Sequence, residues 1–162
     1  GLAIAHFIEP ARYQPERYLT DPALKEAATA RDPIARAALA EELAGNMRVH
    51  MIYAVKAGRP LPAAPAPEEM GNIPVLRDAT LRMQAKGMRA GASLRLVFDG
   101  LPFDLVLPDL AGPILAAIDG KRDLAAIARL MPTGVDSARF QADWLRLYTA
   151  LAPANKLLLK RG

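Results

Sequence analysis

Cysteine is absent from this 162-residue sequence, and histidine occurs only at His6 and His50. Without cysteine the chain can form neither disulfides nor thiolate metal sites, a composition typical of a cytoplasmic protein. The two histidines lie far apart and lack the close spacing of a zinc-binding motif. The sequence therefore predicts no metal site, and we expect His50 to be exposed.

The residues that would carry catalysis or bind a nucleotide are also missing. Serine occurs only at Ser93 and Ser137, and neither lies in the Gly-x-Ser-x-Gly turn that presents a nucleophile. Neither a glycine-rich dinucleotide loop nor a Walker-type phosphate loop is present. The paired acids Glu41-Glu42 and Glu68-Glu69 are predicted to be surface charge. We therefore expect no catalytic residue and no cofactor-binding residue in this chain.

Long apolar runs are missing too. No stretch approaches the roughly 20 apolar residues that span a bilayer, so the sequence predicts no membrane association. The opening residues, GLAIAHFIEPARY, lack the basic start and the cleavage site of a signal peptide. The sequence leaves open whether the chain is a fragment of a longer protein.

Positive charge is concentrated in one short segment. The net charge of the chain is +4, and the excess lies within residues 75–96, where Asp78 is the only acid. Such a cluster could contact an anionic partner, although a solvated surface on strands or turns is the plainer interpretation. The candidate partner-contact residues are Arg77, Arg82, Lys86, Arg89 and Arg95.

Residues 1–57 form the first of three predicted sections, and their pattern is mainly helical. Two helices are expected to start at Asp21-Pro22 and Asp32-Pro33, because aspartate caps free N–H groups and proline fits the first helical position. Residues 48–56 alternate and suggest a strand, with a helix as the alternative. The apolar residues expected to share the buried helix faces are Leu24, Ala27 and Ala28, then Ile34, Ala38, Leu39 and Leu43.

Residues 58–74 form the second section, with the sequence GRPLPAAPAPEEMGNIP. The density of proline favours extended polyproline II structure. We therefore interpret this segment as a linker between domains.

Residues 75–162 form the third section. The clearest signal is a hairpin over 93–107, in which Asp99-Gly100 suits a two-residue turn. Its two strands alternate Leu94, Leu96 and Phe98 with Phe103, Leu105 and Leu107. The preceding stretch TLRMQAK, residues 80–86, suggests another strand.

Three helices and a short strand are predicted after the hairpin. The first helix contains Ile114, Leu115 and Ile118; the second is capped by Asp123 and buries Leu124, Ile127 and Leu130; the third is capped by Asp136 and buries Phe140, Trp144, Leu147, Tyr148 and Leu151. The stretch KLLLK, residues 156–160, closes the domain as a strand. The predicted fold is α+β, with a helical N-terminal section followed by a winged-helix domain.

A helix-turn-helix pattern raises the question of DNA binding, which the charge of the helices disfavours. Arg129 is the only long polar side chain of the second helix, and the predicted solvent face of the third helix, Arg139, Gln141, Asp143 and Arg146, is nearly neutral. Because DNA affinity depends on neutralised phosphates, nucleic acid is not the expected partner.

Four segments together resemble the C-terminal region of bacterial class I S-adenosylmethionine-dependent methyltransferases. These segments are IAHFIEPARYQPERYLTDP (4–22), ARAALAEELAGNMRVHMIYAV (35–55), ILAAIDGKRDLAAIARL (114–130) and WLRLYTALAPANKLLLKR (144–161). In that family, a methyltransferase regulatory domain and a winged-helix domain, similar to those of protein-lysine methyltransferases, follow the catalytic domain. The cofactor residues of the family lie upstream of this region, so none is carried over.

The resemblance implies a non-catalytic accessory, substrate-recognition or assembly region whose parent protein uses S-adenosylmethionine. Its expected partners are the catalytic domain of the same parent chain, a protein substrate or a second copy. Residues 1–57 are expected to dock on that catalytic domain, because their alanine-rich helices supply little core of their own. The alternative is a free-standing winged-helix module that binds a peptide or, less plausibly, nucleic acid. The methyl acceptor, the oligomeric state and the relative pose of the two sections are not predicted.

Overall fold

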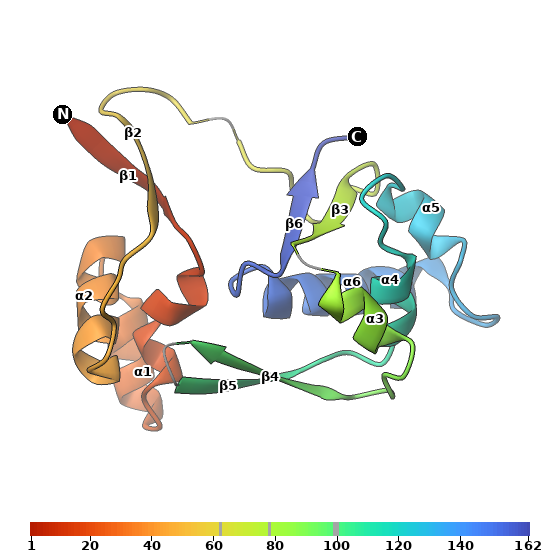
Figure 1. Ribbon diagram of the computed structural model, residues 1–162, viewed down its shortest axis with the longest axis horizontal. Coiled ribbons are helices and arrows are strands. Elements are labelled where there is room, and N and C mark those ends of the chain that lie inside the picture. The colour runs from red at the N-terminus through yellow and green to blue at the C-terminus, as the bar shows by residue number, and fades with distance from the viewer. Residues whose placement is uncertain (62, 78, 99–100) are drawn as a thin grey trace. The chain divides into compact units, whose positions relative to one another are not determined.

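The computed structural model describes residues 1–61, 63–77, 79–98 and 101–162. The chain separates into two compact units (Figure 1). The first unit contains Gly1–Pro62 together with the hairpin segment Val97–Phe103, and the second contains Ala63–Leu96 and Asp104–Gly162. The two units are described separately below.

In the first unit, helices are inserted between two paired strands. The elements are β1 (Leu2–Phe7), the 3-10 helices η1 (Pro10–Tyr13) and η2 (Pro15–Arg17), α1 (Pro22–Thr29), α2 (Pro33–Ala44) and β2 (Ile52–Lys56). Strands β1 and β2 form an antiparallel ribbon, with a register shift between Ile4 and His6. The sequence did not predict β1, and the predicted strand over 48–56 forms only from Ile52.

Both predicted helix starts in the first unit are confirmed. The Asp21 carboxylate accepts hydrogen bonds from the backbone N–H groups of Ala23 and Leu24, at 2.8 and 3.1 Å. The Asp32 carboxylate caps α2 in the same way. These contacts satisfy donors that have no partner within a helix.

The predicted buried faces of α1 and α2 are wrong in most positions. Leu24 and Ile34 are 56% and 54% exposed, and Leu43 is exposed as well. The buried side chains are instead Ala28, Ala37 and Ala40. Both helices contact η2, and small side chains allow such close approach of backbones. The helical period places an alanine stripe beside a leucine and isoleucine stripe, so the period alone does not decide which stripe is buried.

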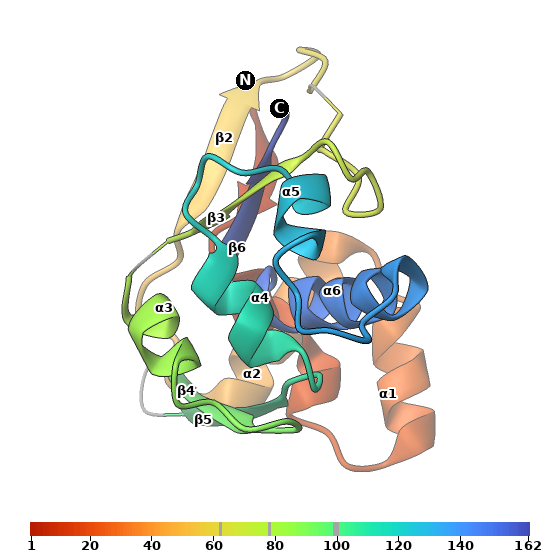
Figure 2. The same ribbon diagram turned by 90° about the vertical axis from the view of Figure 1, so that its right-hand side faces the viewer.

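The second unit contains most of the remaining elements. These are β3 (Ile73–Leu76), α3 (Thr80–Ala85), α4 (Ala111–Ala117), α5 (Leu124–Ala128), α6 (Ser137–Leu151) and β6 (Leu157–Lys160), while β4 (Ser93–Phe98) and β5 (Leu101–Val106) contribute residues to both units. Strands β3 and β6 pair antiparallel (Figures 1 and 2). Strands β4 and β5 form a separate two-stranded sheet. The chain is thus a mixed α and β protein, as predicted.

Helix α6 carries the main apolar stripe of the second unit. The side chains of Phe140, Trp144, Leu147 and Leu151 are at most 1% exposed, which confirms the predicted stripe. Tyr148 is half-buried beside the Trp144 ring. The Asp123 and Asp136 caps are confirmed by hydrogen bonds to the N–H groups of Ala126 and Arg139.

The predicted hairpin is present, and its inward positions Leu96, Phe103, Leu105 and Leu107 are buried. The proposed turn at Asp99-Gly100 lies outside the described residues.

Three details of the second unit correct the sequence analysis. The stretch 80–86 contains helix α3 instead of a strand, with Leu81 and Ala85 buried one helical turn apart. Leu130 is 54% exposed because α5 ends at Ala128. Asp143 is buried instead of facing solvent, and its carboxylate accepts the N–H of Leu110 at 3.0 Å, which satisfies a donor at the start of α4.

Part of the proline-rich segment is hydrogen-bonded to the helices of the second unit. The indole Nε1–H of Trp144 donates to the carbonyl of Pro67 at 2.8 Å. The carbonyls of Met70 and Asn72 accept N–H groups at the start of α5, both at 3.0 Å. Residues 67–72 therefore cover α5 and α6 and satisfy polar groups that would otherwise lack partners.

Substitution of Trp144 tests this arrangement. Trp144→Ala removes a fully buried ring and should lower the free energy of unfolding by about 3–5 kcal/mol. Trp144→Phe retains a ring but loses the hydrogen bond to Pro67, which should cost about 1 kcal/mol from the bond itself, plus a packing loss. Urea unfolding followed by circular dichroism measures both values. An unshifted transition in Trp144→Ala would show that the stripe is not a core.

Candidate interaction surface

Large apolar side chains remain exposed mainly in the first unit. In the second unit, the described residues of this kind are only Met83, Val106, Leu130 and Leu158. The first unit exposes Leu2, Ile4, Leu24, Ile34, Leu43, Val49, Met51, Ile52, Tyr53, Leu61 and Val97. Contiguous exposed apolar patches commonly mark interaction sites, and a partner contact on this unit stays a prediction.

The buried side chains of the first unit are small by comparison. Among the described residues, its buried apolar set is Ala11, Tyr13, Pro15, Ala28, Ala37, Ala40 and Phe103. Alanine buries little area, and burial contributes only about 25 cal/mol per Å². The first unit therefore has more apolar surface to bury than its own fold buries.

Two polar contacts fix the helices of the first unit to its other elements. The Tyr13 hydroxyl lies 3.2 Å from Nδ1 of His50, whose Nε2 lies 3.4 Å from a carboxylate oxygen of Glu41. In the neutral tautomer that suits both contacts, Nε2–H faces Glu41 and the Tyr13 hydroxyl donates to Nδ1. A second contact joins Arg36 of α2 to Glu16 of η2 at 2.7 Å.

The sequence analysis did not predict the polar contacts of His50 with Tyr13 and Glu41, because these residues are distant in the sequence. His50 is partly exposed, as expected, but both ring nitrogens have neighbours. No local spacing links Tyr13, Glu41 and His50; only the antiparallel return of the chain brings them together. The arrangement connects η1, the last turn of α2 and the segment before β2.

The predicted basic residues lie on or next to several elements of the second unit. Arg82 and Lys86 are exposed one turn apart at α3, and Arg89 is exposed shortly after it. Arg95 instead forms a double hydrogen bond with Asp104, at 2.8 and 2.9 Å. That bond lowers the pKa of the Asp104 carboxyl below its usual value. Arg77 is exposed directly after β3. A role of these residues in partner contact stays a prediction.

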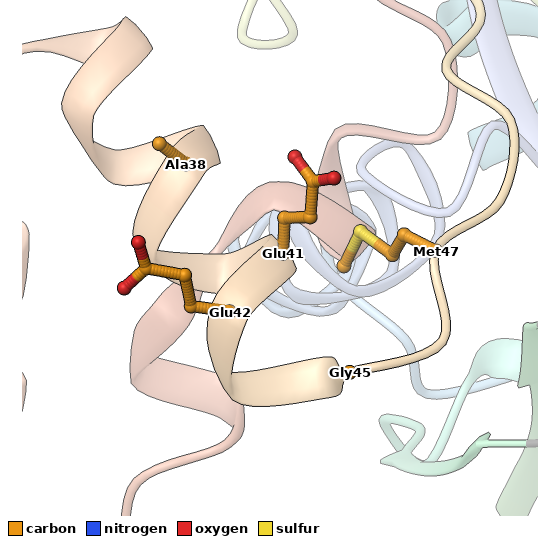
Figure 3. A pocket seen from close by; sticks show the side chains of 5 residues that line it. All are labelled: Ala38, Glu41, Glu42, Gly45 and Met47. Atoms are coloured by element: carbon orange, nitrogen blue, oxygen red, sulfur yellow. The ribbon is translucent and has the colours of Figure 1, made fainter.

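The lining of the surface hollows does not indicate a catalytic or metal-binding site. A hollow of about 460 Å³ at the end of α2 is lined by Ala38, Glu41, Glu42, Gly45 and Met47. Figure 3 shows that the Glu41 and Glu42 carboxylates point in different directions. Within the described parts of the chain, no group of three or more histidine or acidic residues could hold a metal ion.

A second hollow, of about 390 Å³, lies between α5 and α6 and is lined mainly by apolar residues. The apolar lining includes Met70, Val135 and Phe140, and the charged residues Arg129 and Asp136 also line the hollow.

Across the described residues, no helix has both the length and the apolar character needed to cross a bilayer.

Comparison with known proteins adds no assignment. A scan against models of protein families finds no match to this chain, and a search of curated proteins finds no relative.

Charged substitutions test whether the first unit carries the interaction surface. The isolated chain should self-associate weakly, so its average mass in sedimentation should rise with concentration. Ile4→Lys combined with Ile52→Lys should reduce that association, because both side chains are exposed on β1 and β2. Leu130→Lys combined with Leu158→Lys is the matched control in the second unit and should leave it unchanged. If the unsubstituted 162-residue chain is monomeric at high concentration, the first unit does not carry a self-association surface. Equal effects of the two pairs of substitutions would also contradict this location of the surface.

Proposed function

We propose that this chain is a non-catalytic accessory region of an S-adenosylmethionine-dependent methyltransferase, with a role in substrate recognition or assembly. The observation that carries the proposal is the apolar surface of the first unit, which is bare while the side chains buried beneath it are mostly alanines. A region of this kind needs a protein partner. The catalytic domain of the same parent chain is the partner that the sequence resemblance implies.

The second unit supports the proposal as a winged-helix domain. The strand β3 and the β4–β5 hairpin precede α4, α5 and α6, and β6 closes the order by pairing with β3. Its core is complete, with Ile114, Leu124 and Trp144 fully buried. Such a domain offers its outer surface to a substrate while the chemistry occurs elsewhere. The proposed setting is the cytoplasm, in keeping with a chain that lacks cysteine.

Exposed cations of the second unit suit a protein substrate with acidic character. Arg82, Lys86 and Arg89 project from α3 and the residues that follow it. The outer side of α6 is less suited to a nucleic acid, since Arg139 lies 3.9 Å from Asp109 and Arg146 is the other exposed cation there. Three cations at α3 give weak, salt-sensitive attraction to any polyanion. A protein acceptor is therefore the substrate class we favour.

A free-standing peptide-binding module is the second candidate, and one observation favours it. The hollow between α5 and α6 is apolar, with Met70, Val135 and Phe140 in its lining, and it is large enough for one or two apolar side chains. This candidate leaves the exposed surface of the first unit without a role, so we rank it second.

Titration with S-adenosylmethionine tests the proposed function. The parent protein should bind the cofactor stoichiometrically in isothermal titration calorimetry. The 162-residue chain alone should give no binding heat, because it has no glycine-rich cradle for the nucleotide. Micromolar stoichiometric binding by the isolated chain would contradict the non-catalytic role. A parent protein that does not bind the cofactor would favour the second candidate.

A further inference from the structure

The hollow between α5 and α6 has the size and the lining of a site for a small molecule. Its volume of about 390 Å³ lies within the range of about 300–1,000 Å³ that is typical of ligand sites. The walls come from segment 67–72, from α5 and from the loop that leads into α6 (Figure 2). Their apolar residues are Met70, Ala125, Ala128, Val135 and Phe140. Ligand sites combine such walls with a few polar groups that orient the ligand.

Two opposite charges belong to the lining of this hollow. Arg129 directly follows α5, and Asp136 caps α6. Both residues are exposed, and they form no ion pair with each other. One oxygen of Asp136, Oδ1, accepts the Arg139 N–H at 2.8 Å. Among the described residues, neither the other oxygen of Asp136 nor the Arg129 guanidinium has a partner. A cation and an anion are therefore both available at one apolar hollow.

These two charges define the chemistry of a matching ligand. A carboxylate matches the Arg129 guanidinium, which can donate two parallel hydrogen bonds to such a group. An ammonium group matches the free oxygen of Asp136, and an apolar body matches the walls. A ligand with only one charge would cover the other charged side chain without giving it a partner, which is unfavourable. The matching ligand is therefore a small apolar zwitterion.

We propose that the hollow between α5 and α6 is a binding site for a free α-amino acid with an apolar side chain. Arg129 binds the carboxylate of the amino acid, and Asp136 binds its ammonium group. The side chain of the ligand packs against Met70, Val135 and Phe140. This site goes beyond the proposed function, because it needs neither S-adenosylmethionine nor any residue outside the second unit.

A peptide segment matches this arrangement less well than a free amino acid. The main chain of a peptide is neutral, because the carboxylate and the ammonium group of each internal residue are joined in amide bonds. Both charges would have to come from side chains, in addition to the apolar side chain that enters the hollow. Ordering three side chains costs more conformational entropy than ordering one small ligand. Peptide binding at this hollow is therefore the alternative outcome of the test.

A ligand in this hollow adds contacts between parts of the second unit that already depend on each other. The Met70 carbonyl accepts the Ala125 N–H at 3.0 Å, and the Pro67 carbonyl accepts the indole N–H of Trp144 at 2.8 Å. The ligand joins the same segment to the start of α6. A ligand that binds only the folded state stabilises that state, so the amino acid should raise the temperature at which the second unit unfolds.

NMR titration of the whole 162-residue chain with leucine, isoleucine, valine, methionine and phenylalanine tests the proposal. At least one of them should shift the amide signals of α5 and of the start of α6, with a dissociation constant below about 1 mM. Isocaproate, which lacks the ammonium group of leucine, and isopentylamine, which lacks its carboxylate, should bind at least about tenfold more weakly. The absence of saturable shifts with all five amino acids at about 10 mM would overturn the proposal. N-acetyl-leucinamide binding as tightly as leucine would also overturn it, in favour of a peptide.

Matched charge variants locate the site. Arg129→Gln removes the cation, and Asp136→Asn removes the anion while asparagine can still cap α6. Each variant should weaken binding of the amino acid at least about tenfold, because hydrogen bonds to charged groups are lost. Arg146→Gln and Asp109→Asn are the controls, since both residues are exposed in the same unit but do not line the hollow. Unchanged binding in the first pair, or equal weakening in both pairs, would contradict the site.

A variant that fills the hollow gives a test that does not depend on charge. Ala128→Leu introduces a larger side chain into the lining at a helical position that tolerates leucine, and it should abolish binding. Circular dichroism checks that each variant is folded, and the titrations of the unsubstituted chain need no variant at all. Unchanged affinity in a folded Ala128→Leu variant would overturn the proposal. Calorimetry of the parent protein with S-adenosylmethionine tests the proposed function separately, so that either idea can fail without the other.

Discussion

The uneven supply of large apolar side chains constrains this whole structure. In the second unit, α4, α5 and α6 contribute leucine, isoleucine, phenylalanine and tryptophan to one core, with Trp144 at its centre. In the first unit, the helices bury alanines, and the larger side chains lie outside. Hydrophobic burial is the dominant favourable contribution to folding, so the two units differ in how far each can stabilise itself.

Polar contacts compensate for part of this deficit in the first unit. The Asp21 and Asp32 caps fix the helix starts, and the Glu16–Arg36 pair joins η2 to α2. The contacts of His50 with Tyr13 and Glu41 join the end of α2 to η1. A partly exposed ion pair contributes about 0–1 kcal/mol, and a helix cap about 0.5–2 kcal/mol. They set the geometry of the unit, but they do not replace a core.

Much of the fold could be predicted from the sequence wherever the signal is local. Helix caps such as Asp123 and Asp136 depend on side chains two or three residues away, and the α6 stripe repeats over four turns. The hairpin alternation was also informative. The misassigned elements depended on tertiary context: α3 has only six residues, too few to distinguish its period, and β1 is a strand only because β2 returns beside it.

The candidate interaction surface was only partly accessible to sequence analysis. The alanine content of residues 1–57 already indicated that this section has few large apolar side chains for a core. The expectation of a partner followed from it. The location of the surface was not predicted, because the alanine and leucine stripes of α2 have the same period and only packing against η1 and η2 selects one of them.

Thermal unfolding observed by two probes tests the central claim most directly. Trp144 is the only tryptophan and lies in the second unit, so its fluorescence reports on that unit, whereas far-ultraviolet circular dichroism reports on the helices of both. If the first unit lacks a sufficient core, part of the helical signal should be lost at a lower temperature than the change in tryptophan emission. Coincident transitions by both probes, as in a single cooperative domain, would contradict the account.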